Sequence, residues 1–297
     1  MTTLRIVHMT RYLYDRPVCF GVHHLMLRPR DAHDMRILRT GLAVSPTARL
    51  DWTFDTFGNS VGWLSFEEDA AELVIVSELD LRRYGLDDPL PVLSNSSAAY
   101  PFQYDPDDAT DLGPLLLLLW PGERSDVEAW IASRLPRLPT ISVEVLDALS
   151  SEIHDGFRYR RREAYGTQSP ATTIRSGEGT CRDFALLFME AARTLGFAAR
   201  FVTGYLYDPA SDVSAGDVDA GTIRGGGSTH AWADVFIPGV GWVEFDPTNR
   251  IAASRNLVRV ATTRSPSQAA PVSGTWRAAG ARFLEMDVSV SVVRRDD

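Results

Sequence analysis

The sequence predicts an α+β fold in which an all-β domain, sandwich- or barrel-like, precedes a core built from a helix packed on an antiparallel sheet. Three observations support this. Alternating apolar segments fill residues 1–85, helical periodicity begins after residue 116, and a helix that is apolar on most sides starts at Cys181 and is followed by strand-like segments.

The composition excludes several classes of protein. The chain has 297 residues, 44% hydrophobic and 23% charged, as in ordinary globular proteins. A net charge of -9 argues against a nucleic-acid binder, which needs a basic surface to neutralise phosphates. The two cysteines, Cys19 and Cys181, are far apart and suit a reducing compartment. With no export signal and no apolar run of about 20 residues, we expect a cytoplasmic protein with no membrane partner. The oligomeric state stays open.

Residues 1–85 are predicted to form the β-rich domain. Six short segments alternate apolar with polar residues and are bounded by Pro, Gly, Asp or Asn, a pattern typical of antiparallel strands. Asp55 to Asn59 reads DTFGN and predicts a turn, because Gly and Asn tolerate the left-handed backbone that hairpins need.

The next boundary follows from a change in composition. Residues 86–115 contain several prolines among Ser, Asn and Asp, which indicates a linker or an ordered strap that crosses the core. Residues 116–260 are predicted to form the core. Residues 261–297 are predicted to be a C-terminal tail that ends in an alternating strand.

The central helix of the core is predicted to start at Cys181 and to end before Gly196. Phe184, Phe188 and Leu195 share a face with Cys181 at three- and four-residue spacing, and residues between them are apolar too. A helix of this kind is buried. Gly196 suits the left-handed residue that commonly follows a helix.

Cys181 has the sequence context of a nucleophile. A thiol at the start of a helix lies near unpaired backbone N–H groups and the positive end of the helix dipole, which favour a thiolate. Its own N–H could face a developing oxyanion. Gly177 and Gly179 would allow a substrate backbone to come close to the sulfur.

A base and an orienting group follow on a predicted hairpin. His230 lies on one strand and Asp246 on the other, and a turn centred near Pro238 would make them direct cross-strand partners. Each residue has a structural alternative: a packed core cysteine, a satisfied strand histidine, and a turn aspartate before proline. The order Gly-x-Gly-x-Cys, His, Asp favours the chemical interpretation.

The motifs GEGTCRDFALLFMEAARTLGF, THAWADVFIPGVGWVEFDPTN and the upstream FRYRRREAYGTQSPATTIRS resemble the transglutaminase-like superfamily of papain-type cysteine enzymes. The first 85 residues resemble the β-rich N-terminal domain of its bacterial branch. The resemblance implies a Cys-His-Asp triad at Cys181, His230 and Asp246.

Further positions are interpreted through the same resemblance. Asp183 matches a family position and is interpreted as structural. Trp232 and Trp242 match aromatic positions, with substrate contact the alternative to packing in the sheet. Tyr159, Tyr165 and Gln168 are the candidates for a second oxyanion donor, and Trp232, Tyr165 and Gln168 are the candidate substrate-binding residues. No cofactor or metal is implied: Cys19, His23 and His24 lack a fourth ligand for zinc, and the calcium sites of animal transglutaminases have no counterpart.

The expected function is a cysteine-dependent amide-bond enzyme acting on a peptide or protein amide, either a peptidase or amidase or a transglutaminase-type acyltransferase. A thioester on Cys181 would be resolved by water or by an amine. Hydrolysis is the simpler outcome, because water needs no acceptor site. The alternative is a binding or scaffold module that keeps the fold without catalysis.

Overall fold

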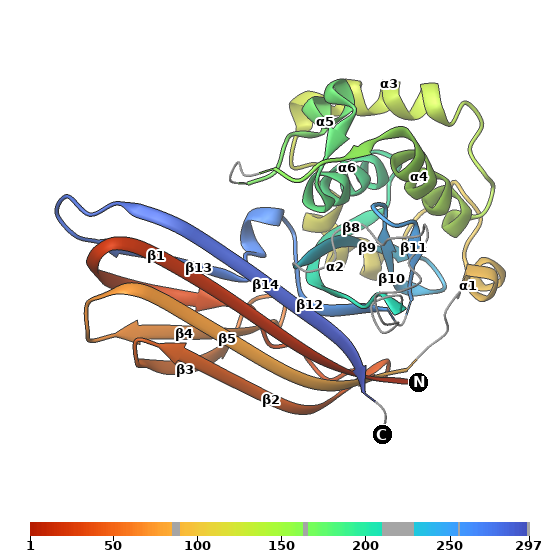
Figure 1. The fold of residues 1–297 in the computed structure, drawn as a ribbon. Coiled ribbons are helices and arrows are strands. Elements are labelled where there is room, and N and C mark those ends of the chain that lie inside the picture. The colour runs from red at the N-terminus through yellow and green to blue at the C-terminus, as the bar shows by residue number, and fades with distance from the viewer. Residues whose placement is uncertain (85–89, 163–165, 210–228, 255, 296–297) are drawn as a thin grey trace, which may run out of the picture.

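The computed structural model describes residues 1–84, 90–162, 166–209, 229–254 and 256–295. Within these residues an elongated β-rich part lies beside a part in which helices cover a sheet (Figure 1). Nowhere in these ranges does a helix have the length and apolar character required to cross a membrane.

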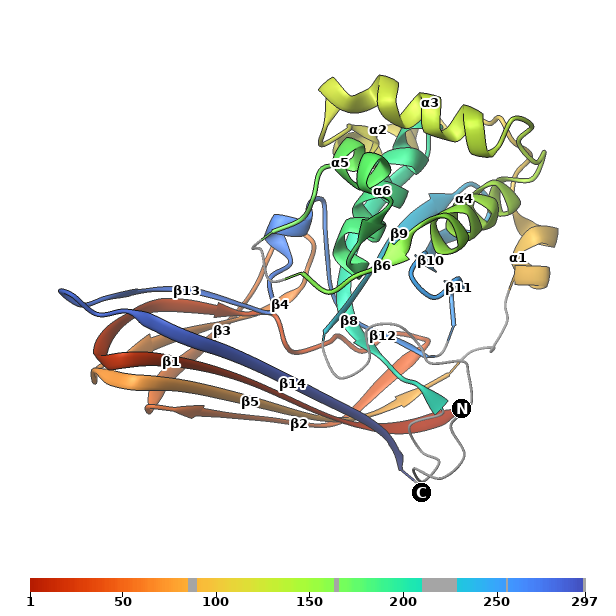
Figure 2. The same cartoon turned by 45° about the horizontal axis from the view of Figure 1, so that its top comes forward.

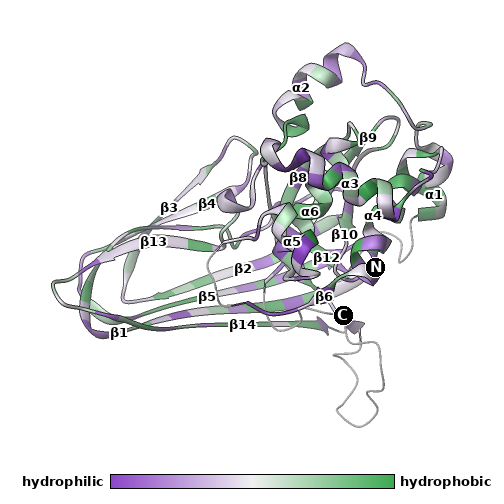
Figure 3. Ribbon diagram, turned by 90° about the horizontal axis from the view of Figure 1, so that it is seen from above, coloured by the Kyte–Doolittle hydropathy of each residue, from purple (hydrophilic) through white to green (hydrophobic). Residues whose placement is uncertain are grey.

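The first 84 residues form five antiparallel strands. They are β1 (Thr2–Leu25), β2 (Met35–Ser45), β3 (Ala48–Phe54), β4 (Ser60–Phe66) and β5 (Ala70–Arg83). Hydrophobic and hydrophilic residues alternate along the long strands (Figure 3), and every second side chain at the start of β1 is buried. The predicted turn is present: Asp55 accepts hydrogen bonds from the N–H groups of Phe57 and Asn59, and Gly58 has φ of 73°.

One long strand replaces the first two predicted segments, because no turn interrupts β1 for 24 residues. Its first half pairs with β5, and its second half pairs with β4. Leu64 on β4 and Leu73 on β5 pack together with Phe20 on β1 in one apolar core. The domain is therefore a sandwich whose two layers share β1.

The segment predicted as a C-terminal tail completes this sheet. Strands β13 (Val272–Arg277) and β14 (Phe283–Arg295) both pair antiparallel with β1. The predicted final strand exists, but it belongs to the β-rich part at the other end of the sequence (Figure 2). The β-rich part therefore includes β13 and β14 in addition to residues 1–85, which were predicted to form it alone.

The predicted strap contains two helices, α1 (Leu90–Ser96) and α2 (Pro106–Leu116). Between them the aromatic side chains of Tyr100 and Phe102 pack on Phe197 at ring-centroid distances of 5.6 and 4.9 Å. This stretch is an ordered strap over the core, because its aromatic residues gain the burial that a free linker lacks.

The core consists of helices and a five-stranded sheet of order β11-β10-β9-β8-β12. The strands are β8 (Ala198–Leu206), β9 (His230–Ile237), β10 (Gly241–Asp246), β11 (Ile251–Ala252) and β12 (Leu257–Thr263). The helices are α3 (Arg124–Arg134), α4 (Ser142–Gly156), α5 (Pro170–Ser176) and α6 (Cys181–Thr194), with 3-10 turns η1 (Pro121–Glu123) and η3 (Pro266–Gln268). The short strands β6 (Arg158–Tyr159) and β7 (Glu178–Gly179) pair in parallel.

Helix α6 is the centre of this core, as the sequence predicts. It begins at Cys181, twelve of its fourteen residues are buried, and Gly196 follows it with φ of 93°. Its neighbours α3, α4 and α5 and the strands β8 and β9 surround it (Figure 2). Burial on every side makes α6 a rigid support for its first residue.

The two parts of the molecule are joined by buried polar contacts. His8 Nδ1 lies 2.9 Å from the Tyr205 hydroxyl, across the boundary between β1 and β8. Asn59 binds the backbone of Thr262 twice, donating to its carbonyl at 2.7 Å and accepting from its N–H at 2.9 Å. Polar groups buried with their partners in place fix the relative position of the two parts.

Candidate active site

Cys181 is the first residue of α6, and its placement is set by a capping box. Thr180 is the N-cap: its hydroxyl accepts from the Asp183 N–H, and the Asp183 carboxylate accepts from the Thr180 N–H at 2.9 Å. The Cys181 side chain, 7% exposed, therefore sits at the positive end of a well-capped helix.

The two glycines before Cys181 serve the local chain path. Gly177 ends α5 with φ of 66°, which favours glycine, and a Cβ on Gly179 would lie 3.0 Å from both Asp183 and Phe184. The close approach that Gly179 allows is thus between β7 and the first turn of α6. The sequence interpretation assigned that space to a substrate backbone.

Asp183 anchors the segment in front of the cysteine. Its side chain is fully buried and accepts hydrogen bonds from Arg162 Nη2 at 3.0 Å and from the Gln168 N–H at 2.6 Å. The structural interpretation of Asp183 agrees with these contacts. The Gln168 side chain also has a role within the fold, because its amide nitrogen donates to the Glu178 carbonyl at 3.1 Å, and substrate binding by Gln168 stays a prediction.

His230 and Asp246 lie together in the interior of the core. His230 Nε2 is 2.8 Å from Asp246 Oδ2, and both side chains have no exposed area. Asp246 also accepts from Asn249 Nδ2 at 2.8 Å and from the Thr248 N–H at 2.9 Å. Sequence reasoning missed these two supporting residues, although an Asp followed by Thr and Asn after a proline is a common hydrogen-bonded turn.

The register of the hairpin differs from the predicted one. The turn is centred on Gly239, not Pro238, because Ile237 pairs with Gly241 and Val240 N–H donates to the Ile237 carbonyl. In this register His230 and Asp246 are diagonal neighbours two residues apart, not direct partners. They stay on one face because a shift of the centre by one residue moves the pairing by two.

Charge on both sides of His230 opposes the effect of its burial. Burial, the largest single influence, lowers the pKa of His230, but the Asp246 carboxylate and contact with Cys181 together raise it to about 10. In return His230, Asn249 and the Thr248 N–H outweigh burial and lower the pKa of Asp246. The pair is thus arranged to hold an imidazolium beside a carboxylate.

The second nitrogen of His230 faces the thiol. Nδ1 has no partner that meets hydrogen-bond geometry within the described residues, although interaction with the Cys181 sulfur contributes to the raised pKa of His230. Catalytic hydrogen bonds of this kind are often long or poorly aligned and shorten when substrate binds.

The candidate aromatic residues Trp232, Trp242 and Tyr165 differ in what the structure describes of their surroundings. Trp232 is fully buried, its Nε1 donates to Glu244 at 3.3 Å, and its ring stacks near His230 at 6.1 Å. These contacts give Trp232 a role in the sheet, and its contact with a substrate stays a prediction. Trp242 lies under the Arg200 guanidinium at 4.0 Å. Tyr165, like most of the Gly-rich loop between Pro209 and Gly227, falls outside the described residues.

Tyr159 is brought towards the cysteine by strand pairing. It faces Gly179 across the β6–β7 bridge, two residues before Cys181, and packs edge-on against Phe184. Burial raises the pKa of Tyr159 to about 12, with further contributions from the negative charges of Cys181 and Asp246. Of the two predicted oxyanion donors that the structure describes, Tyr159 is the one that packs on the first turns of α6 beside the thiol.

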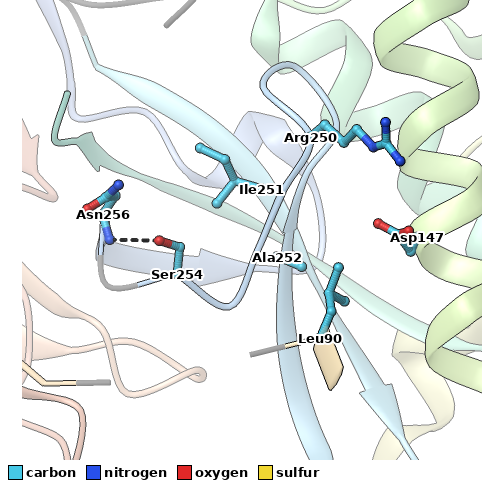
Figure 4. A pocket seen from close by; sticks show the side chains of 7 residues that line it. All are labelled: Leu90, Asp147, Arg250, Ile251, Ala252, Ser254 and Asn256. Carbon is cyan, nitrogen blue, oxygen red and sulfur yellow. Dashed lines mark hydrogen bonds between the residues drawn. The ribbon is translucent and has the colours of Figure 1, made fainter. Parts of the chain in front are cut away.

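Two cavities in the core do not include the Cys181, His230 and Asp246 side chains. One of about 330 Å³ lies between α1, α4 and β11, and Figure 4 shows Arg250 extending across it towards the helix that carries Asp147. The other, of about 360 Å³, is lined by residues of α3, α4 and α5 around Trp130. Both cavities are therefore separate from the candidate site at the N-terminal end of α6.

Comparison with known proteins agrees with this architecture. Residues 131–247 match the transglutaminase-like superfamily core, and residues 4–82 match the bacterial transglutaminase-like N-terminal region. An uncharacterised protein of Mycobacterium tuberculosis is 31% identical over 97% of this chain and 92% of its own length. One of Mycobacterium leprae is 23% identical over 99% of each chain.

A solved structure shares the whole fold. The crystal structure of a candidate cysteine protease from Cytophaga hutchinsonii aligns with 100% of this chain and 92% of its own, with a TM-score of 0.72 at 19% sequence identity. At that identity the likeness concerns the fold. The match extends over the β-rich part as well as the core.

Proposed function

We propose, because this chain belongs to the transglutaminase-like superfamily, that it is a cysteine-dependent enzyme acting on amide bonds of peptides or proteins. The observation that carries the proposal is the joint placement of Cys181 at the capped start of α6 and of His230 between that thiol and Asp246. These are the three groups that thiol catalysis needs.

In the proposed first step the Cys181 thiolate attacks the carbonyl carbon of the substrate amide and forms a tetrahedral oxyanion. The oxyanion collapses, the C–N bond breaks, and His230 gives its proton to the departing amine. A thioester remains on Cys181, and His230 is neutral. Asp246 holds Nε2 of the imidazole, so that Nδ1 stays on the side of the sulfur.

In the second step His230 takes a proton from water, and the resulting hydroxide attacks the thioester and releases the acid and the thiolate. An amine in place of water would give transamidation by the same proton transfers. Two groups are suited to the oxyanion: the Cys181 N–H at the start of α6 and the Tyr159 hydroxyl.

Selective alkylation tests the nucleophile. Iodoacetamide at neutral pH is expected to label Cys181 much faster than Cys19, which serves as the internal control, and His230→Ala should slow the labelling of Cys181 alone. Equal, slow labelling of both thiols would show that Cys181 is an ordinary buried cysteine, as expected for a scaffold module.

The fate of the thioester is tested with a glutamine-containing peptide and a fluorescent primary amine. Release of ammonia without incorporation of the amine indicates hydrolysis, and incorporation indicates transfer; Cys181→Ala should abolish both. The chain has a useful property for this assay. The chain contains 30 arginines and no lysine, so no lysine side chain can act as an internal acceptor.

A further inference from the structure

A cluster of arginines leads into the candidate site of a protein that is acidic overall. Arg158, Arg160, Arg161 and Arg162 occupy four of five consecutive positions, although the net charge of the chain is -9. The pairing of β6 with β7 places this segment beside the residues that precede Cys181. Just after β6, the Arg160 N–H donates to the Gly179 carbonyl at 2.9 Å, so the backbone stays extended through Arg160.

Two of the four arginines have carboxylate partners. Arg160 Nη1 lies 2.8 Å from Glu178 Oε1, and Arg162 Nη2 lies 3.0 Å from the buried carboxylate of Asp183. Arg158 and Arg161 are exposed, and neither forms an ion pair with any residue that the structure describes.

The backbone pairing with β7 distinguishes these two. Because it extends from Arg158 to Arg160, Arg158 points to the side opposite Tyr159, and Arg161 directly follows the residue that is bonded to Gly179. The Tyr159 side is the side of the thiol. The negative charge of Cys181 raises the pKa of Tyr159, and the positive charge of Arg161 lowers it, so both charges act on the same phenol.

The other charges around the thiol are compensated. Asp246 is paired with His230, Asp183 with Arg162, and Glu178 with Arg160. Within residues 158–162, all of them described, Arg158 and Arg161 have no carboxylate partner among the described residues, and Arg161 is the one whose charge acts on Tyr159. An uncompensated guanidinium attracts anions and binds a carboxylate through two parallel hydrogen bonds.

We propose that Arg161 gives the Cys181 site a preference for acyl donors that carry a carboxylate next to the amide that is attacked, as in peptides rich in glutamate or aspartate. This inference rests on the proposed function and specifies its substrate class. Arg161 acts here as a residue that selects and orients the donor, and the bond-breaking steps remain those of Cys181 and His230.

Two alkylating reagents that differ in charge test the proposal. Iodoacetate and iodoacetamide transfer nearly the same group to a thiol, but only iodoacetate is an anion. Arg161→Gln is expected to lower the rate of Cys181 labelling by iodoacetate by about 3- to 10-fold and to leave the iodoacetamide rate within about twofold. Raising the salt concentration should also lower the rate at which iodoacetate labels Cys181 in the wild type, because salt screens the charge of Arg161.

The chain provides a matched control. Arg158→Gln removes the same charge from the same short segment but from its other side, and the ratio of iodoacetate to iodoacetamide rates should stay at the wild-type value. Arg161→Lys, which keeps the charge and changes the shape, should restore most of the ratio. A merely structural role of Arg161 would not produce this recovery, because both reagents would be affected alike.

The outcomes separate the two proposals. If iodoacetamide does not distinguish Cys181 from Cys19, the proposed function fails. If it does, and Arg161→Gln leaves the ratio unchanged, the preference for acidic donors is overturned alone. A fall of the ratio in Arg158→Gln as large as in Arg161→Gln would show a general effect of net charge and would also overturn the assignment to Arg161.

Discussion

Two buried histidines, one in each part of the molecule, have opposite electrostatics. His8 in β1 and His230 in β9 are each 1% exposed. Burial lowers the pKa of His8 to about 4, whereas Asp246 and Cys181 overcome burial and raise the pKa of His230 to about 10. Burial is thus common to both, and the partners make the difference.

The partners of His8 are neutral. Its Nδ1 lies 2.9 Å from the Tyr205 hydroxyl, and its Nε2 lies 3.0 Å from the Thr10 hydroxyl. Hydroxyl groups form hydrogen bonds with a neutral imidazole but do not offset the free-energy cost of burying a charged one, so His8 stays neutral. Its bond to Tyr205 joins the two parts of the fold. His230 has a carboxylate on one side and a thiol on the other, which is the arrangement of a site that moves protons.

The largest effect is expected from removing the charge that distinguishes His230. Asp246→Asn keeps the size of the side chain, but burial should then dominate and lower the pKa of His230. We expect Cys181 alkylation at neutral pH to slow by about 10²- to 10⁴-fold, the range over which general acid–base groups contribute. The rate is measured with iodoacetamide and read by mass spectrometry.

Asp15→Asn in the β-rich part is the control for this substitution, because it removes a carboxylate that pairs with Arg282 and has no contact with His230. An unchanged alkylation rate in Asp246→Asn would mean that Asp246 has no influence on the thiol, and His230 would then resemble His8.

The two histidines should also act on stability in opposite pH ranges. His230 has a raised pKa, so its contribution is fully present below pH 6.5 and is lost as pH rises towards 10. His8 has a lowered pKa, so its contribution is present above pH 6.5 and is lost as pH falls towards 4. At about 1.4 kcal/mol per pKa unit, the contribution is on the order of 5 kcal/mol for His230 and 3–4 kcal/mol for His8.

Urea unfolding of the wild type, His8→Gln and His230→Gln between pH 4 and 10 measures these contributions. Relative to the wild type, His8→Gln should remove the loss of unfolding free energy on the acid side, and His230→Gln should remove the loss on the alkaline side. The same pH dependence in both variants would contradict the contrast between the two sites.

The smallest effect is expected at the joint between the two parts. Tyr205→Phe leaves His8 Nδ1 without its partner in a buried position, which costs about 1–3 kcal/mol of unfolding free energy. Alkylation of Cys181 should stay at the wild-type rate, because no charged group near His230 is changed. A drop in that rate comparable to Asp246→Asn would show that the joint controls the site, and the two histidines would not be independent.

Much of the site is visible in the sequence because its cues are local. The start of α6 at Cys181, its end before Gly196 and the pair of strands that carry His230 and Asp246 all follow from patterns within about 20 residues. His230 and Asp246 lie on the same face of the hairpin although the turn is centred one residue later than predicted. Their separation of 16 residues is even, and this decides the face for any turn that is centred on a residue.

The missed features depend on contacts between distant residues. Strand β14 pairs with β1 across almost the whole chain, and no local pattern names its partner. The hydrogen bonds of Trp232 to Glu244 and of Gln168 to the Glu178 carbonyl likewise form only when the strands and helices pack.

The sequence by itself determined which groups are available: a thiol at a helix start, a histidine and an aspartate on one face of a hairpin, and arginines before the thiol. These follow from periodicity and capping, which act over a few residues. Only the tertiary structure decided what each group does, because a pKa depends on the charges and solvent around it. His8 and His230 look alike in the sequence, and their neighbours, brought from distant positions, give them opposite properties.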